Sequence, residues 1–205
     1  MLAWLTVVGL LAGTRAPPEG FADLRKELAG ACFVAGYAAA DNFTGAPLPG
    51  YAAAGAWLLK EPAEALGRVQ AGLIAEGLVL LIYDAYRPRR ASEAMLAWAR
   101  RAGKTQLIKD GYIASRSNHN HGHTVDLGLA RAGSCEPVDM GTAWDTLDVR
   151  SHTLNAKGAV RVNRLKLRDA MRAQGFHDYS REWWHFNYPL AGTRGIDVPY
   201  GLYER

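Results

Sequence analysis

The chain has 205 residues, of which 49% are hydrophobic, so it is long enough to bury one sizeable core, and no linker-like stretch divides it. Its formal net charge is +4, but the basic residues are dispersed, and only 87–90 and 100–101 hold tight clusters. Because no basic run alternates with aromatic residues, the composition argues against a nucleic-acid-binding protein.

The N-terminal segment has features of an export signal. Residues 2–12 are apolar but too few to span a bilayer, and with residues 13–16 they resemble the hydrophobic region and cleavage end of a secretory signal. The usual positive start is absent, and Pro17 follows the expected cleavage point directly, so the alternative is an apolar segment packed on the domain. We expect a signal segment at 1–16 and one domain at 17–205. An exported or periplasmic location is therefore favoured over a cytoplasmic one.

The two cysteines, Cys32 and Cys135, are far apart in the sequence, and neither lies in a C-x-x-C motif. This argues against a zinc–thiolate site. In an exported protein they can form a disulfide, because an oxidising compartment favours one. Two unrelated free thiols are the alternative.

Three segments have the apolar period of amphipathic helices, and a glycine follows each of them within two residues. They are 61–76, 92–101 and 163–173. In the first, Pro62 suits the opening turn, and one apolar stripe is formed by Leu66, Val69 and Leu73.

The strands are expected at 32–37, 78–84, 124–129 and 183–188. The nearly continuous apolar run at 78–84 is typical of a central strand. Segment 21–28 is ambiguous between helix and strand, and the expected irregular segments are 42–51, 104–114 and 138–148. Because strands and helices do not alternate as βαβ units, we expect an α+β fold with helices packed on a mainly antiparallel sheet.

A histidine-rich segment at 115–129 is the strongest chemical signal in the chain. His119, His121 and His123 alternate, and Asp126 follows within a strand pattern. The strand period places Asp126 on the face opposite Val125, Leu127 and Leu129. His and Asp side chains held by a rigid element are how metal sites are usually built.

The third metal ligand is expected near the C-terminus. His185 is the strongest candidate, because it follows Glu182 in an aromatic segment that would exclude water. A carboxylate beside a metal ligand is the usual position of a general base. Glu182 and His185 are three positions apart, and in a strand such residues face opposite sides. For both side chains to reach one metal ion, Glu182 must lie in the turn before the strand. Taken singly, the histidine loop reads as solvated and the Trp-Trp-His segment as core; the joint pattern favours a metal site.

Together these motifs resemble those of a known family. Ser117-x-His119-x-x-Gly122-x-Thr124-x-Asp126 with Glu182-x-Trp184-His185 is similar to the signature of zinc D,D-peptidases, which share a fold with the Hedgehog signalling domain. Within that group, 37–45, 84–88 and 140–145 resemble the VanX-type D-alanyl-D-alanine dipeptidases. The departures are Thr124, where alanine is usual, and Trp144, where phenylalanine is common.

The resemblance implies one Zn²⁺ per chain, held by His119, Asp126 and His185. It also implies that Glu182 takes the proton of the attacking water and passes it to the leaving amine. Arg87, which Pro88 keeps out of helical geometry at a strand end, would stabilise the oxyanion of the tetrahedral intermediate.

Three further residues are implied in substrate binding. Tyr37 and Asp145 would hold the free ammonium, and Ser117 would hydrogen-bond near the C-terminal carboxylate. Without the resemblance, we would interpret Tyr37 as a core tyrosine and Asp145 as a turn aspartate. A surface arginine is the alternative for Arg87. His121 and His123, which lie beyond the motif, are interpreted as loop or supporting residues, with an exchange of ligands as the lesser alternative.

The activity that the resemblance implies is hydrolysis of D-Ala-D-Ala to D-alanine, a reaction of peptidoglycan and cell-wall metabolism. The expected partner is thus a small D-amino dipeptide, with no nucleic acid and no stable membrane span. One alternative is a D,D-carboxypeptidase acting on peptidoglycan stem peptides, which an exported location would favour. The other is a non-catalytic zinc-binding domain, against which Glu182 and Arg87 argue, because a structural zinc needs neither a base nor an oxyanion donor.

Overall fold

The computed structural model describes residues 15–202. The predicted signal segment at 1–16 lies outside this range except for its last two residues. Between residues 15 and 202, no helix combines the length and apolar character needed to cross a membrane.

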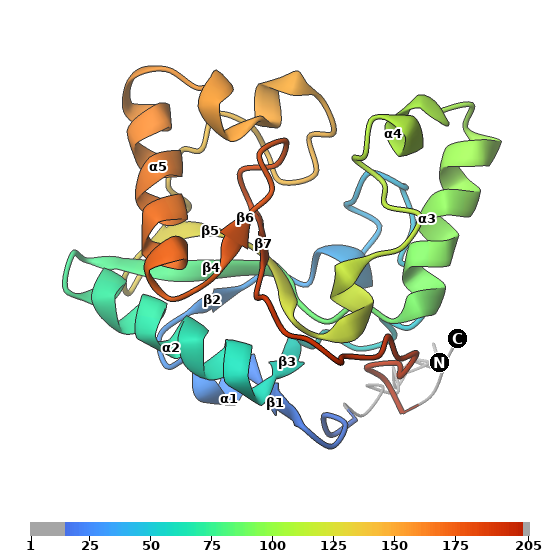
Figure 1. The fold of residues 1–205 in the computed structure, drawn as a ribbon, viewed down its shortest axis with the longest axis horizontal. Helices are drawn as coiled ribbons and strands as arrows, with labels where there is room; N and C mark the ends of the chain where they lie inside the picture. Colours follow the sequence, from blue (N-terminus) through green and yellow to red (C-terminus); the bar gives the residue numbers. More distant parts are fainter. Residues whose placement is uncertain (1–14, 203–205) are drawn as a thin grey trace, which may run out of the picture.

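A five-stranded sheet forms the centre of the molecule (Figure 1). Its spatial order is β2 (Cys32–Phe33), β4 (Leu78–Asp84), β5 (Thr124–Arg131), β7 (His185–Asn187) and β6 (His177–Asp178). Only the β2–β4 pair is parallel, and the other neighbours are antiparallel. The prediction of an α+β fold with a mainly antiparallel sheet is confirmed.

The two long strands, β4 and β5, divide their side chains between two faces. Leu80 and Ile82 of β4 enter the main core with Leu127 and Leu129 of β5, their ladder partners. Val79 and Leu81 face the other side, in a smaller cluster with Cys32 and Ala130. Asp126 alternates with the core residues of β5, as its spacing predicted, and so lies on that other side.

A β-bulge interrupts the β4–β5 ladder. Ile82 pairs with Leu127, but the next pair joins Asp84 to Asp126, so Tyr83 is left over. If the ladder ran through Tyr83 without a bulge, Asp84 would pair with Val125 and share the core face of Ile82. The slip of one position instead puts its carboxylate beside Asp126, because residues opposite each other in a ladder share a face.

Two helices cover the core face of the sheet. α2 (Lys60–Ile74) and α5 (Gly158–Ala173) contact each other and supply Leu66, Val69 and Leu73 from α2 and Leu167 and Met171 from α5. Both were predicted with apolar stripes at these positions. α5 begins five residues before the predicted 163, at Gly158.

The opposite wall is built around α3 (Arg89–Arg101), which stands across from α5 in Figure 1. α3 packs Met95 into a second, aromatic-rich cluster with Tyr37, Tyr51, Trp57 and Tyr86. α4 (Gln106–Lys109) follows as a single turn where a loop was expected.

Shorter elements complete the chain. The ambiguous segment 21–28 contains both structures, β1 (Phe21–Asp23) and then α1 (Leu24–Glu27), which Asp23 caps. β1 pairs with β3 (Trp57–Leu59) in a separate two-stranded sheet. The 3-10 turns are η1 (Gly36–Ala38), η2 (Asn118–His121), η3 (Val149–Ser151) and η4 (Thr153–Asn155).

Two predicted strands are shorter than expected. The strand predicted at 32–37 ends at Phe33, and the chain turns through Gly36, where a side chain would collide with the ring of Trp144. The strand predicted at 183–188 begins only at His185, because the backbone N–H of Trp183 donates to Ser151 instead of entering the ladder.

A disulfide joins Cys32 of β2 to Cys135 in the turn after β5, with Cα atoms 5.8 Å apart. Of the two alternatives left open by the sequence, the structure therefore has the bonded pair. The bridge ties the edge strand to a segment 103 residues away.

Candidate active site

A cavity of about 250 Å³ lies between β5, β7, η1 and α3. It brings together the residues to which the family resemblance assigns a role, from segments spread over the chain. Those residues are Tyr37, Arg87, Ser117, His119, Asp126, Asp145, Glu182 and His185.

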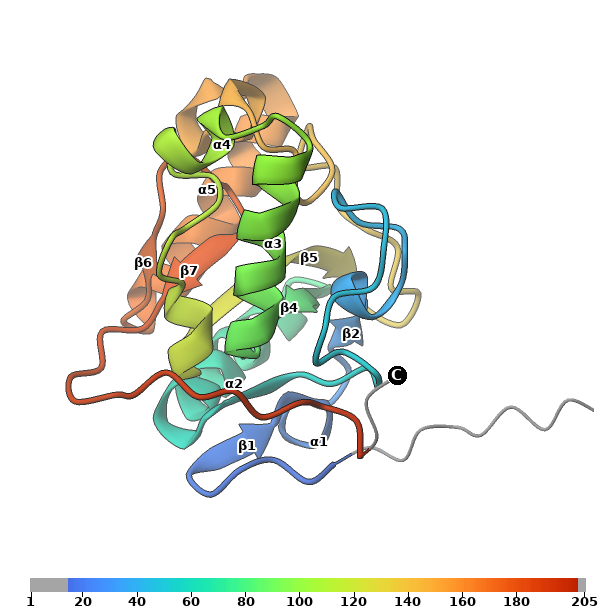
Figure 2. The ribbon, with the colours of Figure 1, turned by 90° about the vertical axis from the view of Figure 1, so that its right-hand side faces the viewer.

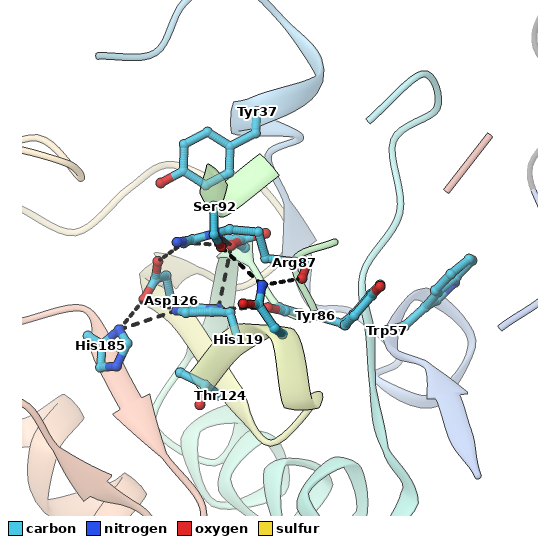
Figure 3. Close-up of polar contacts among 12 residues, drawn as sticks. Tyr37, Trp57, Tyr86, Arg87, Ser92, His119, Thr124, Asp126 and His185 are labelled. Carbon is cyan, nitrogen blue, oxygen red and sulfur yellow. Dashed lines mark hydrogen bonds and ion pairs between the residues drawn. The ribbon is translucent and has the colours of Figure 1, made fainter. Parts of the chain in front are cut away.

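Three of them converge on one point (Figure 3). The His119 Nε2 atom lies 3.3 Å from Oδ1 of Asp126 and 3.3 Å from Nδ1 of His185, and this last atom is 3.0 Å from the same Asp126 oxygen. Ligand atoms at about 2.0–2.2 Å from a tetrahedral metal ion lie roughly 3.3–3.6 Å apart. The three side chains can therefore hold a metal ion with little movement.

The sheet and its neighbours fix these ligands. Asp126 and His185 are direct partners in the β5–β7 ladder, so their side chains share a face. His119 comes from η2, and its Nδ1–H donates to the carbonyl oxygen of Ala85 at 2.7 Å. Because a carbonyl only accepts, Nδ1 carries the hydrogen, and in the neutral ring this leaves the lone pair of Nε2 directed at Asp126 and His185.

The charges at this point suit a cation. Burial alone would raise the pKa of Asp126, but His119 and His185 hold that pKa well below its ordinary range, so the carboxylate is ionised. Burial, with the charges of His119 and Arg87, lowers the pKa of His185 despite the opposite effect of Asp126, which favours the neutral imidazole. A deprotonated carboxylate and neutral imidazoles are the forms that bind a metal.

Glu182 lies in the turn before β7, as the geometry of a strand required. Its Oε2 atom is 3.8 Å from Nδ1 of His185, and its side chain is buried. Burial, with the charges of Asp126 and Asp145, raises the pKa of Glu182 well above its ordinary value. A carboxyl group with a raised pKa beside a metal position is suited to accept and return a proton.

Arg87 is buried, which excludes the alternative of a surface arginine. Its Nε donates to Asp84 at 2.9 Å, one of its terminal nitrogens lies 3.4 Å from Asp126, and its guanidinium stands over the ring of Tyr37. Asp84 in turn accepts a 2.6 Å hydrogen bond from the hydroxyl of Tyr51. The arginine is thus held as a cation beside the candidate metal ligands.

The loop that carries Arg87 is also tied to η2. The backbone N–H of Arg87 donates to the carbonyl of His119 at 3.2 Å. The amide of Asn120 donates to the carbonyl of Arg87 at 2.8 Å and to the hydroxyl of Ser92 at 3.0 Å. These hydrogen bonds hold Arg87 next to His119, the first candidate metal ligand (Figure 3).

Tyr37 and Asp145 form a second polar pair in the cavity. The Tyr37 hydroxyl donates to Oδ2 of Asp145 at 2.8 Å. Asp145 sits in a left-handed turn, with φ of 59°, which aspartate tolerates better than most residues. Burial, with the charge of Asp126, raises the pKa of Asp145 to about 8. An arriving ammonium group would favour the ionised form and pair with it.

The two departures from the family motif have structural partners. Thr124 is fully buried, and its hydroxyl donates to Asn187 across the β5–β7 pair at 2.8 Å. Trp144, directly before Asp145, stacks on Tyr83, with ring centroids 5.4 Å apart. Tyr83 is the residue that the bulge in β4 leaves over, so the bulge also supports the turn of Asp145.

Ser117 and the two extra histidines differ in placement. Ser117 is buried and lines the cavity, and its hydroxyl makes no hydrogen bond within residues 15–202. His121 and His123 do not line the cavity; His121 faces Thr193, and the two imidazole rings contact each other.

Two important residues were not identified as functional from the sequence. Asp84 reaches the site only because of the bulge. Arg164 of α5 is buried, and its guanidinium donates to the backbone carbonyls of Met140, Arg150 and His152, thereby holding the loop that contains Asp145. Its signal is an arginine in register with the apolar stripe of α5, three residues before Leu167.

Comparison with known proteins agrees with this site. Residues 18–201 match the M15 peptidase family described as D-Ala-D-Ala dipeptidase. A D-alanyl-D-alanine dipeptidase of Enterococcus faecalis is 38% identical over 198 residues, covering 89% of this chain and 94% of the relative. One of Streptomyces coelicolor is 36% identical over 181 residues (81% and 90%), and one of Escherichia coli is 38% identical over 159 residues (77% and 78%). The resemblance seen in the motifs is confirmed: the chain belongs to the M15 metallopeptidase family of D-Ala-D-Ala dipeptidases.

Proposed function

We propose that the chain hydrolyses free D-Ala-D-Ala with one Zn²⁺ held by His119, Asp126 and His185 and with Glu182 as general base. The observation that carries the proposal is the convergence of these four side chains in one small cavity, opposite the Tyr37–Asp145 pair. Three metal ligands alone could form a structural metal site. The adjacent buried carboxyl group of Glu182 favours a catalytic site, because a structural metal needs no base.

The donor set supports zinc. Two imidazoles and one carboxylate are borderline ligands that zinc prefers, and three protein ligands leave a coordination position free. When bound, the metal supplies Lewis-acid polarisation of water and of the scissile carbonyl.

Glu182 and Arg87 divide the remaining chemistry between them. Glu182, 3.8 Å from a metal ligand, is placed to take the proton from the attacking water and give it to the nitrogen of the leaving D-alanine. Arg87, fixed by Asp84 beside the metal ligands, is placed to stabilise the negative charge that develops on the carbonyl oxygen. Groups of this kind commonly contribute on the order of 3 kcal/mol to the barrier.

The Tyr37–Asp145 pair supports a dipeptide rather than a longer chain. A carboxylate that pairs with a free ammonium leaves an unpaired charge when the N-terminus is acylated. The cavity volume of about 250 Å³ is also below the roughly 300–1,000 Å³ of pockets that accept drug-sized ligands.

The test compares substrates. The zinc-loaded protein is expected to release D-alanine from D-Ala-D-Ala at least about 100-fold more efficiently than from a muramyl pentapeptide. Equal or preferred attack on the pentapeptide would favour the D,D-carboxypeptidase reading. No turnover of either would favour a binding domain.

The metal and base are tested separately. Metal analysis by mass spectrometry should find about one zinc per chain in protein purified without added metal. Glu182→Gln should keep that zinc and lose about 10³-fold or more in kcat. A variant that retains full turnover would eliminate Glu182 as the base.

We also propose export of the protein. The Cys32–Cys135 disulfide supports it, because such bonds persist in oxidising compartments. Fractionation followed by N-terminal sequencing should find a processed chain outside the cytoplasm, and recovery of intact Met1 from the cytoplasm would contradict this.

A further inference from the structure

The proposed substrate carries an ammonium group at one end and a carboxylate at the other, and the residues considered so far provide a counter-charge only for the ammonium. Asp145 offers a negative charge for the ammonium. The C-terminal carboxylate needs a donor or a positive charge, because an unpaired carboxylate in a confined site loses its hydration without compensation. This inference rests on the proposed dipeptidase function and identifies the group that binds the other end.

Among the cavity-lining residues, the arginines are Arg87 and Arg116. Arg87 is already committed, since it is buried between Asp84 and Asp126. Arg116 is different: it is exposed at the edge of the cavity, and within the described part of the chain it makes no hydrogen bond or ion pair. Its guanidinium is therefore available to a ligand.

The position of Arg116 suits the end of the substrate away from the amine. It precedes Ser117, whose buried hydroxyl lines the same cavity and also has no hydrogen-bond partner among residues 15–202. Figure 2 shows the yellow-green segment 112–117 on one side of α3, whereas η1 and the gold loop 140–148, which carry Tyr37 and Asp145, lie on the other side. The reacting bond would lie between these two ends.

We propose that Arg116 is a specificity-determining residue that binds the C-terminal carboxylate of the dipeptide, together with the hydroxyl of Ser117. An arginine fork recognises a carboxylate by charge-assisted hydrogen bonds, and an exposed one reaches it without losing an existing partner. The cavity then pairs Asp145 with the ammonium and Arg116 with the carboxylate, which selects a free dipeptide at both termini.

The test uses D-Ala-D-Ala and its C-terminal amide, which differ only in the charge that Arg116 would bind. Arg116→Gln should raise KM for D-Ala-D-Ala about tenfold or more, with kcat nearly unchanged, and should leave the KM for the amide unaltered. Arg116→Lys, which keeps the charge, should recover much of the loss. Arg100→Gln removes an exposed arginine of α3 that does not line the cavity and should change neither substrate.

An unchanged KM for D-Ala-D-Ala in Arg116→Gln, or an equal rise for acid and amide, would overturn the inference. Calorimetry in a zinc-loaded Glu182→Gln background separates it from the proposed function, because binding is then measured without turnover. A wild type that cleaves nothing, with dipeptide binding that still weakens about tenfold on Arg116→Gln, would refute the activity and retain the role of Arg116.

Discussion

The two ends of the cavity are built by different means. The proposed metal ligands Asp126 and His185 lie on neighbouring strands whose ladder fixes their spacing. Tyr37 and Asp145 come from a short 3-10 turn and from an irregular loop, and their alignment depends on other contacts, above all those of Arg164. Strand register thus fixes the spacing at the proposed metal end, whereas the geometry of the proposed amine-binding end depends on the loop that carries Asp145.

The largest effect is expected at the metal end. Asp126→Ala removes the anionic ligand, and we expect loss of bound zinc and a decrease in kcat/KM of about 10³-fold or more. Metal analysis and D-alanine release measure both quantities. Asp169→Ala, at an exposed aspartate of α5, is the matched control. Stoichiometric zinc in Asp126→Ala would show that this carboxylate is not a ligand.

At the amine-binding end, Asp145→Asn should keep the zinc and lower kcat/KM for D-Ala-D-Ala by about 100-fold, because the ammonium loses its counter-charge. A variant that retains wild-type efficiency would mean that the ammonium binds elsewhere in the cavity. Tyr37→Phe, which removes only the hydroxyl that orients Asp145, should show a smaller loss.

The Asp145→Asn variant also gives a test of pH dependence. Burial raises the pKa of Asp145 to about 8 from an ordinary value near 4, so between these values the folded protein holds a proton that the unfolded chain releases. The free energy of unfolding should therefore fall as the pH rises from about 4 to 8. Metal-free Asp145→Asn should match the wild type at pH 4 and exceed it at pH 9 by about 1 kcal/mol or more. Parallel stability curves for the two proteins would contradict this.

A smaller effect on turnover is expected from the loop support. Arg164→Met leaves three backbone carbonyls without their donor and should lower the free energy of unfolding by about 2–4 kcal/mol. Because the loop of Asp145 loosens, KM should rise a few-fold while zinc content stays constant. Arg161→Met, at an exposed arginine of the same helix, is the control. If Arg164→Met lost bound zinc to the same extent as it lost substrate affinity, the two ends of the cavity would not be independent.

The smallest effect on turnover should follow removal of the disulfide. The double variant Cys32→Ala, Cys135→Ala releases a loop of 103 residues and should lower the free energy of unfolding by about 3–5 kcal/mol. Neither cysteine lines the cavity, so kcat/KM below the melting temperature should stay within about twofold. A large loss of activity in a folded variant would show that the edge strand β2 contributes to the activity of the site.

The contrast between the two ends also explains what the sequence could predict. Asp126 followed from an alternating strand pattern, and the position of Glu182 in a turn followed from the same geometry, because both depend on local periodicity. The burial of Arg164 and the 3-10 turn at Gly36 depend on contacts with segments far along the chain, which periodicity does not encode. Tyr37 and Asp145 were identified only through family resemblance, since a turn aspartate and a core tyrosine have no pattern of their own.

Asp84 is the clearest case, because its neighbours in sequence indicate the wrong face. An unbroken alternation over 78–84 assigns its carboxylate to the apolar side. The bulge at Tyr83 reverses that assignment, and the spacing of apolar residues does not predict the bulge.

Tyr83 interrupts the regular pairing of the sheet, but it also supports the candidate site. Deleting Tyr83 would let β4 and β5 pair without interruption, and a redesign for thermal stability that counts backbone hydrogen bonds would select the deletion. The repaired ladder would keep Asp84 opposite Asp126 but would remove the ring on which Trp144 rests, directly before Asp145. The irregular strand is thus a place where stabilising the scaffold and preserving activity are opposing design goals.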